Sequence, residues 1–524
     1  MLLIPVTAVA VLASACGDSD SNDSSSASTT SPGGSAAPTT VSCPAKGQEV
    51  DTAKLYIEHN AALALPLGEA LRTVTLDPYY VVGNWSPLHQ ILLLAEWHAF
   101  GTNPLPYRVT NALLHALVAL AMVAAGRRIG LSRPAALAAA TLFLVHPVAA
   151  EPVGWINQSK TLLSVGFALC ALERWLGWLR EPRPGRAVAT TVLGALALLA
   201  KPAAIPLPAI LLFAAWTHGR PVPVRRAALW LIPLATIGVI AFALGLAAQA
   251  TQGGVAPWFG GGPLGTLQIL PWIGWRYVRL VFAPFDLVHG VHPAALSGWS
   301  DERLLWPAAA LVAVALLVVR ACLLRRERWL AAAWFFGMLL PVIQLIPMIN
   351  LFADRYLYVA LPGALWLIAD VVDTAARRRG VGAQHAVFGL LAIFTVLIAG
   401  FSHGRARKWA DPESLYREAT IAYPLGRTGW TGLGAELHRQ GDFAGAARAY
   451  LQSLAVFPGD GHVRHLLGRV RLEEQRRDLA LYDFETSLRL APTHFNASWT
   501  RRQIAGLRAR DVRPAPDEPP LPAP

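Results

Sequence analysis

Charged residues are scarce in this chain: they make up 15% of its 524 residues, while hydrophobic residues make up 54%. Soluble domains are about a quarter charged, so this composition excludes a chain that is soluble throughout. Cysteine is scarce as well, and the four cysteines, at positions 16, 43, 170 and 322, have no metal-binding or redox spacing. The sequence therefore gives no reason to expect a cysteine-based metal or redox centre.

What the chain has instead is long apolar segments, concentrated between residues 105 and 402. A helix needs about 20 apolar residues to cross a bilayer, so this part predicts an all-α, polytopic bundle of about 10 to 11 membrane helices. Segment 266–284 is apolar but carries Arg276 and Arg279, and we expect it to be interfacial or re-entrant. The other apolar helices are expected near 107–125, 134–150, 160–178, 187–200, 203–217, 227–248, 303–323, 329–350, 356–373 and 385–402.

Basic residues are distributed unevenly over the connections between these helices. The formal net charge is +12, mostly from arginine, and a basic balance can indicate nucleic-acid binding. Here every second connection carries only Lys160, Lys201 or Arg355, or no basic residue at all. Arginine-rich connections stay on the cytoplasmic side of a membrane. We therefore expect no nucleic-acid partner, and a multi-pass protein of the bacterial cytoplasmic (inner) membrane whose residues 17–104 and C-terminal part face outward. The arginine clusters lie at 127–133, 174–186, 220–226, 320–328 and 377–379.

The N-terminal residues 1–16, MLLIPVTAVAVLASAC, are apolar and end in small residues before Cys16. This pattern resembles a bacterial lipoprotein signal with Cys16 as the lipidated residue; a short first membrane helix and a misplaced start codon are the alternatives. Residues 17–48 are rich in serine and are expected to form a disordered tether. The tail, 511–524, is expected to be disordered too.

Residues 404–510 have the composition of a soluble domain and contain an internal repeat. A spacing of 34 residues is the period of tetratricopeptide repeats, in which each unit is a pair of helices. The sequence predicts repeats at about 427–460 and 461–494, with an earlier helix at 412–423 and a capping helix at 494–508. Leu433, Gly434, Ala446, Tyr450 and Pro458 recur at this spacing as Leu467, Gly468, Ala480, Phe484 and Pro492.

Polar side chains at the ends of membrane helices are costly and often functional. Four clusters of them lie on the end that is expected to face outward. Their carboxylates, cations and imidazoles suit an anionic, lipid-linked substrate that enters from the bilayer. The clusters are Asn111 and His115; His146, Glu151, Trp155 and Lys160; Lys201; and Asp354, Arg355 and Tyr356.

Each cluster also has a structural interpretation. Asn111 and His115, one helical turn apart, can form hydrogen bonds between helices, and Glu151 can pair with Lys160. Lys201 can lie at the level of the lipid headgroups or meet a lipid phosphate as a point charge. Asp354 can cap a helix, whereas Arg355 can bind a phosphate with two parallel hydrogen bonds.

Taken in order, these segments resemble the transmembrane and tetratricopeptide repeat-containing protein family and its bacterial relatives, within the GT-C superfamily of glycosyltransferases. The resemblance covers roughly residues 50–500, a membrane domain at 49–403 followed by the repeats. It is carried by WSPL (85–88), FGTNPLPYRVTNALLHAL (100–117), HPVAAEPVGWINQSK (146–160), LLAKP (198–202), ADRYLY (353–358), and Trp409 with ESLY (413–416).

The resemblance implies an inverting transfer of a sugar, of mannose type, from a polyprenyl phosphate to a protein hydroxyl. It implies that Lys160, Lys201 and Arg355 bind the donor phosphate, and that a carboxylate in the first outward loop removes the proton of the acceptor. Relatives have an Asp-Asp pair in that loop, which falls here on Thr52–Ala53. Asp51 is the expected base, with Glu58 and Asp77 as reserves.

Two other functions fit the same sequence. One is a degenerate relative that keeps the fold and binds lipid or client proteins through its repeats without catalysis. The other is a transporter or an assembly scaffold, although no internal duplication typical of transporters appears within 105–402. The sequence leaves open which sugar and which acceptor are used, and assigns no metal ion.

Overall fold

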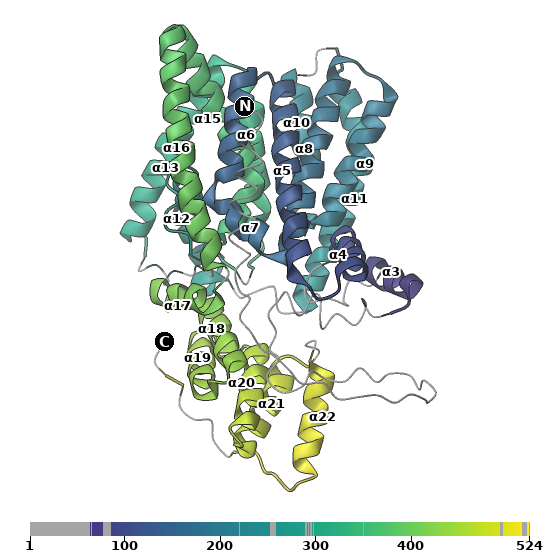
Figure 1. Cartoon of the computed structure of the whole chain (residues 1–524), viewed down its shortest axis with the longest axis vertical. Helices are drawn as coiled ribbons and strands as arrows, with labels where there is room; N and C mark the ends of the chain where they lie inside the picture. Colours follow the sequence, from purple (N-terminus) through teal and green to yellow (C-terminus); the bar gives the residue numbers. More distant parts are fainter. Residues whose placement is uncertain are drawn as a thin grey trace, which may run out of the picture.

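The computed structural model describes residues 63, 65–76, 85–218, 221–251, 258–288, 291, 293, 296, 298–348, 350–409, 411–492, 496–515 and 521–522. A helical bundle occupies the upper part of Figure 1, and a smaller group of helices lies below it. The bundle and the two helices before it are α3 (Leu67–Leu76), α4 (Pro87–Phe100), α5 (Pro104–Ile129), α6 (Arg133–Val145), α7 (Ala150–Gly154), α8 (Ser159–Arg180), α9 (Pro184–Ala200), α10 (Leu207–His218), α11 (Val224–Thr251), α12 (Pro263–Phe282), α13 (Glu302–Leu324), α14 (Arg328–Leu339), α15 (Asp354–Arg378) and α16 (Val381–Lys408).

Several of these helices are long and apolar enough to cross a membrane. Among the described residues six qualify, and the pair formed by α6 and Pro147–Gly154, which is bent by 52°, makes up to seven. Three shorter apolar helices, Pro184–Ala200, Pro202–His218 and Arg328–Val342, accompany them. The chain is thus a multi-pass membrane protein, and the larger number of 10 to 11 crossings stays a prediction. The six candidate membrane spans lie in α5, α8, α11, α13, α15 and α16, and the span in α8 begins earlier, at Ile156.

The helix boundaries follow local sequence signals. The side chain of Asn103 accepts a hydrogen bond from the backbone amide of Leu105 at 3.1 Å at the start of α5, and Pro104 follows in the first turn, where its missing N–H costs nothing. Gly130 ends α5 with φ of 119°, a left-handed conformation that favours glycine. Ser132 then caps α6 through the amide of Ala135 at 3.1 Å. A tight turn therefore joins two apolar helices.

The expected arginine clusters come together at one end of the bundle. Asp370 of α15 pairs with Arg325 and with Arg328, each at 2.7 Å, and bridges the connection between α13 and α14. One turn further along α15, Asp373 accepts a hydrogen bond from Ser132 at 2.7 Å. Several arginine-rich connections therefore share one end, as the sequence predicts.

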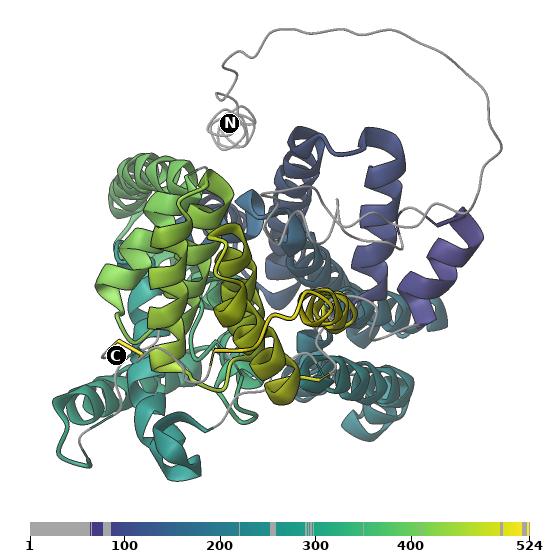
Figure 2. The same cartoon turned by 90° about the horizontal axis from the view of Figure 1, so that it is seen from below.

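The opposite end carries α7, α4 and the C-terminal helices, which lie together at the lower end of the bundle in Figure 1. In Figure 2, which views the molecule from this end, the C-terminal helices lie over one part of the bundle and α3 and α4 lie to the other side. The C-terminal helices are α17 (Pro412–Ala422), α18 (Arg427–Gln440), α19 (Phe443–Val456), α20 (Gly461–Glu473), α21 (Arg477–Leu490) and α22 (Ala497–Arg508).

The 34-residue spacing is reproduced in the packing of α18–α21. A Cβ atom added to Gly434 of α18 would lie 2.7 Å from the ring of Tyr450 in α19, and one added to Gly468 of α20 would lie 2.7 Å from the ring of Phe484 in α21. Both glycines let an aromatic ring of the next helix approach the backbone. Equivalent positions thus make equivalent glycine–aromatic contacts in two successive helix pairs.

Candidate functional site

The segment between α6 and α8 is a chain of short helices that carries most of the second polar cluster. The 3₁₀ helix η2 (Pro147–Ala149), α7 and the 3₁₀ helix η3 (Ile156–Gln158) follow one another without a long helix. Pro147 and Pro152 cannot donate backbone hydrogen bonds, which favours such interruptions. His146 begins this segment and its Nδ1 accepts from the amide of Val148 at 3.3 Å. The side chain of His146 thus has a structural contact at the bend.

Glu151 and Arg355 form a buried ion pair at the start of α15. Arg355 Nη1 lies 2.6 Å from Glu151 Oε1, and the side chains are 11% and 7% exposed. The guanidinium carbon lies 5.3 Å from the ring centre of Trp155 and 5.2 Å from that of Tyr356. The sequence placed these four residues in two separate clusters, and the structure brings them into one.

Lys201 reaches from the hairpin between α9 and α10 to the start of α8. Its Nζ donates to Thr161 Oγ1 at 2.9 Å, and Lys160 Nζ donates to Asn157 Oδ1 at 3.3 Å. Lys160 is close enough to both Lys201 and Arg355 for their charges to act on it. The three residues predicted to bind phosphate therefore lie together at one end of the bundle, and we call Lys160, Lys201 and Arg355 the cationic cluster.

The first polar cluster has a structural role in the described contacts. Asn111 Nδ2 donates to the carbonyls of Val153 and Trp155, at 3.3 and 3.1 Å, and so ties α5 to α7. His115 Nδ1 lies 2.8 Å from the hydroxyl of Tyr358. These contacts agree with the structural interpretation of both residues, and Asn111 also holds the backbone of Trp155 beside Arg355.

Asp354 differs from what the sequence predicts. The N-cap of α15 is Ala353, with no side-chain cap, and Asp354 is the first residue of the helix. The expectation that Asp354 caps this helix is wrong, because the helix begins one residue earlier than a cap at this position would require. The side chain of Asp354 is 5% exposed, and its Oδ1 has no hydrogen-bond partner among the described residues.

Two residues near the site were not assigned to it from the sequence, although Trp409 belongs to the motifs that carry the resemblance. Trp409, which follows α16, stacks on Trp155 with ring centres 6.2 Å apart and an interplanar angle of 22°. His89 of α4 is fully buried, and burial lowers the pKa of its imidazole well below the usual 6.5, with a further contribution from the nearby Lys160 charge. A neutral His89 thus lies close to the cationic cluster. The only signal for it was a polar pair inside an apolar stretch, PLHQILLL.

Four predicted residues lie outside the described part of the chain: Asp51, Glu58, Asp77 and Cys16. Their roles as bases and as a lipidation site stay predictions. Among the residues that are described, no group of three or more His, Cys, Asp or Glu side chains is placed to hold a metal ion.

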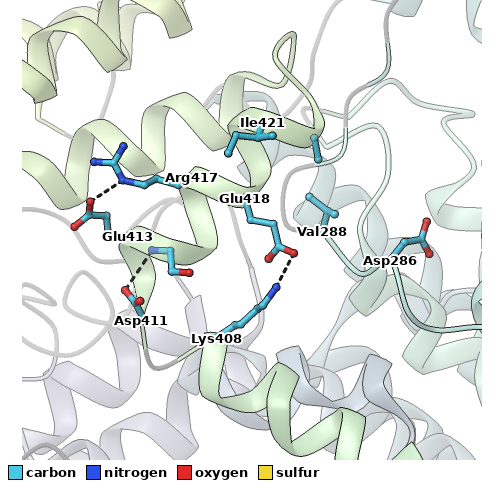
Figure 3. A pocket seen from close by; sticks show the side chains of 10 residues that line it. Asp286, Val288, Lys408, Asp411, Glu413, Arg417, Glu418 and Ile421 are labelled. Carbon is cyan, nitrogen blue, oxygen red and sulfur yellow. Dashed lines mark hydrogen bonds and ion pairs between the residues drawn. The ribbon is translucent and has the colours of Figure 1, made fainter.

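A pocket of about 670 Å³ opens where the C-terminal helices meet the bundle. Figure 3 shows Asp286 and Val288 on one side of it and α17 on the other, with Lys408 directed toward Glu418. Lys408 Nζ lies 2.7 Å from Glu418 Oε1. The remaining lining residues are Asp411, Glu413, Ser414, Arg417, Ile421 and Ala422.

Comparison with known proteins gives partial similarities. No protein-family model matches the chain. A segment of 126 residues, 24% of the chain, is 32% identical to Protein O-mannosyl-transferase Tmtc1 of Drosophila melanogaster, and covers 14% of that relative's length. A crystal structure of the Archaeoglobus fulgidus oligosaccharyltransferase, tethered with an acceptor peptide, aligns over 85% of this chain and 58% of its own, at 15% identity and a TM-score of 0.39. That score is too low to establish a common fold.

Proposed function

We propose that this chain is an inverting membrane glycosyltransferase, which transfers a sugar of mannose type from a polyprenyl phosphate to a hydroxyl group of a protein. The observation that carries the proposal is the cationic cluster. Lys160 and Arg355 are 8% and 9% exposed, and Lys201 is held against the same helix start through Thr161. Polar residues that converge at one end of a membrane bundle mark substrate sites more often than lipid-facing surface.

The charge balance of the cluster favours an anionic ligand. Lys160, Lys201 and Arg355 bring three positive charges, and Glu151 brings one negative charge through its ion pair with Arg355. Like charges that lie together in a buried site repel one another, so a phosphate group that enters the cluster would relieve this repulsion. A phosphate leaving an anomeric carbon gains negative charge, and fixed cations stabilise that charge most in the transition state.

The identity of the sugar and of the acceptor comes from resemblance. The ordered motifs resemble the transmembrane and tetratricopeptide repeat-containing family, and the similar Drosophila protein is named as a protein O-mannosyl-transferase. The chain spans a small part of that relative, so its substrates are a proposal for this chain. By the same resemblance, Asp51, Glu58 or Asp77 would take the acceptor's proton.

We further propose that α18–α21 are two tetratricopeptide repeats that present the acceptor. Stacked helix pairs form a concave surface suited to extended peptide. These helices lie below the end of the bundle that carries α7 (Figure 1), and Arg355 of the cationic cluster pairs with Glu151 of α7. At the junction, Trp409 stacks on Trp155. In this arrangement both the donor site and the repeats face outward from the bacterial cytoplasmic membrane, and a lipid on Cys16 would hold the N-terminus on that side.

The test uses the full chain in lipid nanodiscs with radiolabelled mannosyl-phosphoryl-polyprenol and a soluble peptide rich in Ser and Thr. Wild-type protein should release label to peptide or to water. Replacing Lys160 or Arg355 with Ala should lower turnover about a hundredfold or more, because each removes a charge that stabilises the leaving phosphate. Arg378→Ala, at the opposite end of α15, is the matched control and should change nothing.

The alternatives give different results in the same samples. A wild-type chain that binds polyprenyl phosphate but never releases label would support the degenerate, non-catalytic relative and would contradict the proposal. A chain that neither binds nor turns over the donor would leave a transporter or scaffold as the better account.

A further inference from the structure

Buried carboxylates are almost all paired with cations in the described part of the chain. Glu151, Glu173, Asp370 and Asp483 are typical, each within 2.8 Å of an arginine nitrogen. The two buried carboxylates without an ion pair among the described residues are Glu96 and Asp354. The remaining buried carboxylates are also paired with arginines; they are Asp301, Asp373, Glu436 and Asp460.

These two exceptions have different surroundings. Glu96 lies in α4, beside Thr110 and Tyr107. Asp354 is adjacent in sequence to Arg355, and the charges of Arg276, Arg405 and Glu151 all act on it. A buried polar atom without a hydrogen-bond partner is costly, and such an atom calls for an explanation such as a catalytic role or a missing partner. For Asp354, the missing partner would be a group that visits the site.

The pocket shown in Figure 3 borders groups that surround Asp354. Its wall residue Asp286 lies 3.2 Å from Arg276, and its wall residue Glu418 lies 3.3 Å from Arg405. The backbone of a third wall residue, Val288, is in hydrogen-bonding range of the Asp354 carboxylate. Val288 thus contacts Asp354, and two other wall residues pair with arginines whose charges act on Asp354, so the carboxylate lies near the wall of the pocket.

We propose that the pocket admits the acceptor and that Asp354 is the catalytic residue that takes its proton. The inference rests on the proposed glycosyl transfer. The acceptor oxygen forms a bond to the anomeric carbon, while the bond from that carbon to the phosphate oxygen breaks and its electron pair leaves with the polyprenyl phosphate. The hydroxyl proton passes to Asp354 Oδ1. Arg355, the next residue of α15, belongs to the cluster that receives the phosphate, so one helix start serves both reactants.

This assignment differs from the sequence-based one, which places the base at Asp51, Glu58 or Asp77.

The experiment compares variants of the full chain in nanodiscs with the labelled donor and peptide described above. Asp354→Asn keeps the shape of the side chain and removes its basicity, and should lower kcat about a hundredfold or more. The affinity for polyprenyl monophosphate should stay within about twofold, because the donor-binding cations are intact. Asp354→Glu should restore part of the turnover. The pH profile supplies a second readout, because the low-pH limb of kcat should be lost in Asp354→Asn.

Asp373→Asn is the matched control. Asp373 lies in the same helix, is 6% exposed and also has one carboxylate oxygen without a hydrogen-bond partner among the described residues, but it lies at the opposite end of α15. Its turnover should equal that of the wild type. Turnover above a tenth of the wild-type rate in Asp354→Asn would overturn the inference while leaving the glycosyl transfer intact. A wild-type chain without turnover would contradict the proposed function itself.

Discussion

Neutralising Glu151 should weaken the fold and strengthen phosphate binding at the same time. Glu151→Gln keeps the size of the side chain but removes the charge that faces Arg355 at 2.6 Å. Removal of one partner from a buried ion pair costs about 3–5 kcal/mol. The free energy of unfolding of the ligand-free protein should fall by an amount of this order.

The affinity for phosphate should move in the other direction. A phosphate bound to Arg355 would lie roughly 6 Å from the Glu151 carboxylate, and two unit charges at that separation repel by about 3 kcal/mol at an effective dielectric constant of 20. Loss of this repulsion should tighten binding of polyprenyl monophosphate at least tenfold, since each factor of ten corresponds to about 1.4 kcal/mol. Added polyprenyl phosphate should therefore raise the melting temperature of the variant more than that of the wild type.

The control is Asp370→Asn, which breaks a pair between side chains that are both 5% exposed, at the other end of α15. It should lose a similar amount of stability and keep the wild-type affinity for polyprenyl phosphate. If Glu151→Gln bound polyprenyl phosphate no more tightly than the wild type, the cationic cluster would not be the phosphate site.

Three further outcomes are expected. Gly434→Ala should destabilise the C-terminal helices by about 1–3 kcal/mol in thermal unfolding, because the new Cβ would meet Tyr450 at 2.7 Å, whereas Gly506→Ala, with open space around it, should be neutral or slightly stabilising; equal effects would refute the close packing. Asp483→Asn should lower the free energy of unfolding by about 3–5 kcal/mol in the same measurement, because Asp483 is fully buried between two arginines. A decrease below about 1 kcal/mol, the value of a surface ion pair, would contradict this burial. Burial raises the pKa of Glu96 to about 7, so the folded state binds this proton more tightly than the unfolded state does. The protonated Glu96 side chain therefore contributes stability that is fully present below about pH 4.5 and is lost as the pH rises through 7. Glu96→Gln should thus melt above the wild type at pH 8 and with it at pH 5, and a constant difference would contradict the assigned shift.

Features with a local or periodic signal could be predicted from the sequence. Apolar segments marked the membrane helices, and the 34-residue spacing marked the glycines that pack against Tyr450 and Phe484. The distribution of arginine predicted which helix ends lie together. Arg325 and Arg328, from a connection that the sequence places on the arginine-rich side, pair with Asp370 near the end of α15 on that same side.

Contacts between distant segments could not be predicted. Glu151 and Arg355 are 204 positions apart, and either could have paired with another charge near it in sequence. The stacking of Trp409 on Trp155 depends on how α16 ends against α7, and the burial of His89 depends on the docking of α4. In the same way, the position of the first helical residue decided that Asp354 is not a cap, a difference of one residue that patterns do not resolve.

The location of the lipid phosphate is the most direct test of the central claim. A cryo-electron microscopy structure of the full chain in nanodiscs with polyprenyl monophosphate would give it. The account predicts phosphate density within hydrogen-bonding distance of Lys160, Lys201 and Arg355, with the polyprenyl chain leaving between helices toward the lipid. Phosphate density at any other place, with the Glu151–Arg355 pair undisturbed and the cluster without ligand, would contradict it.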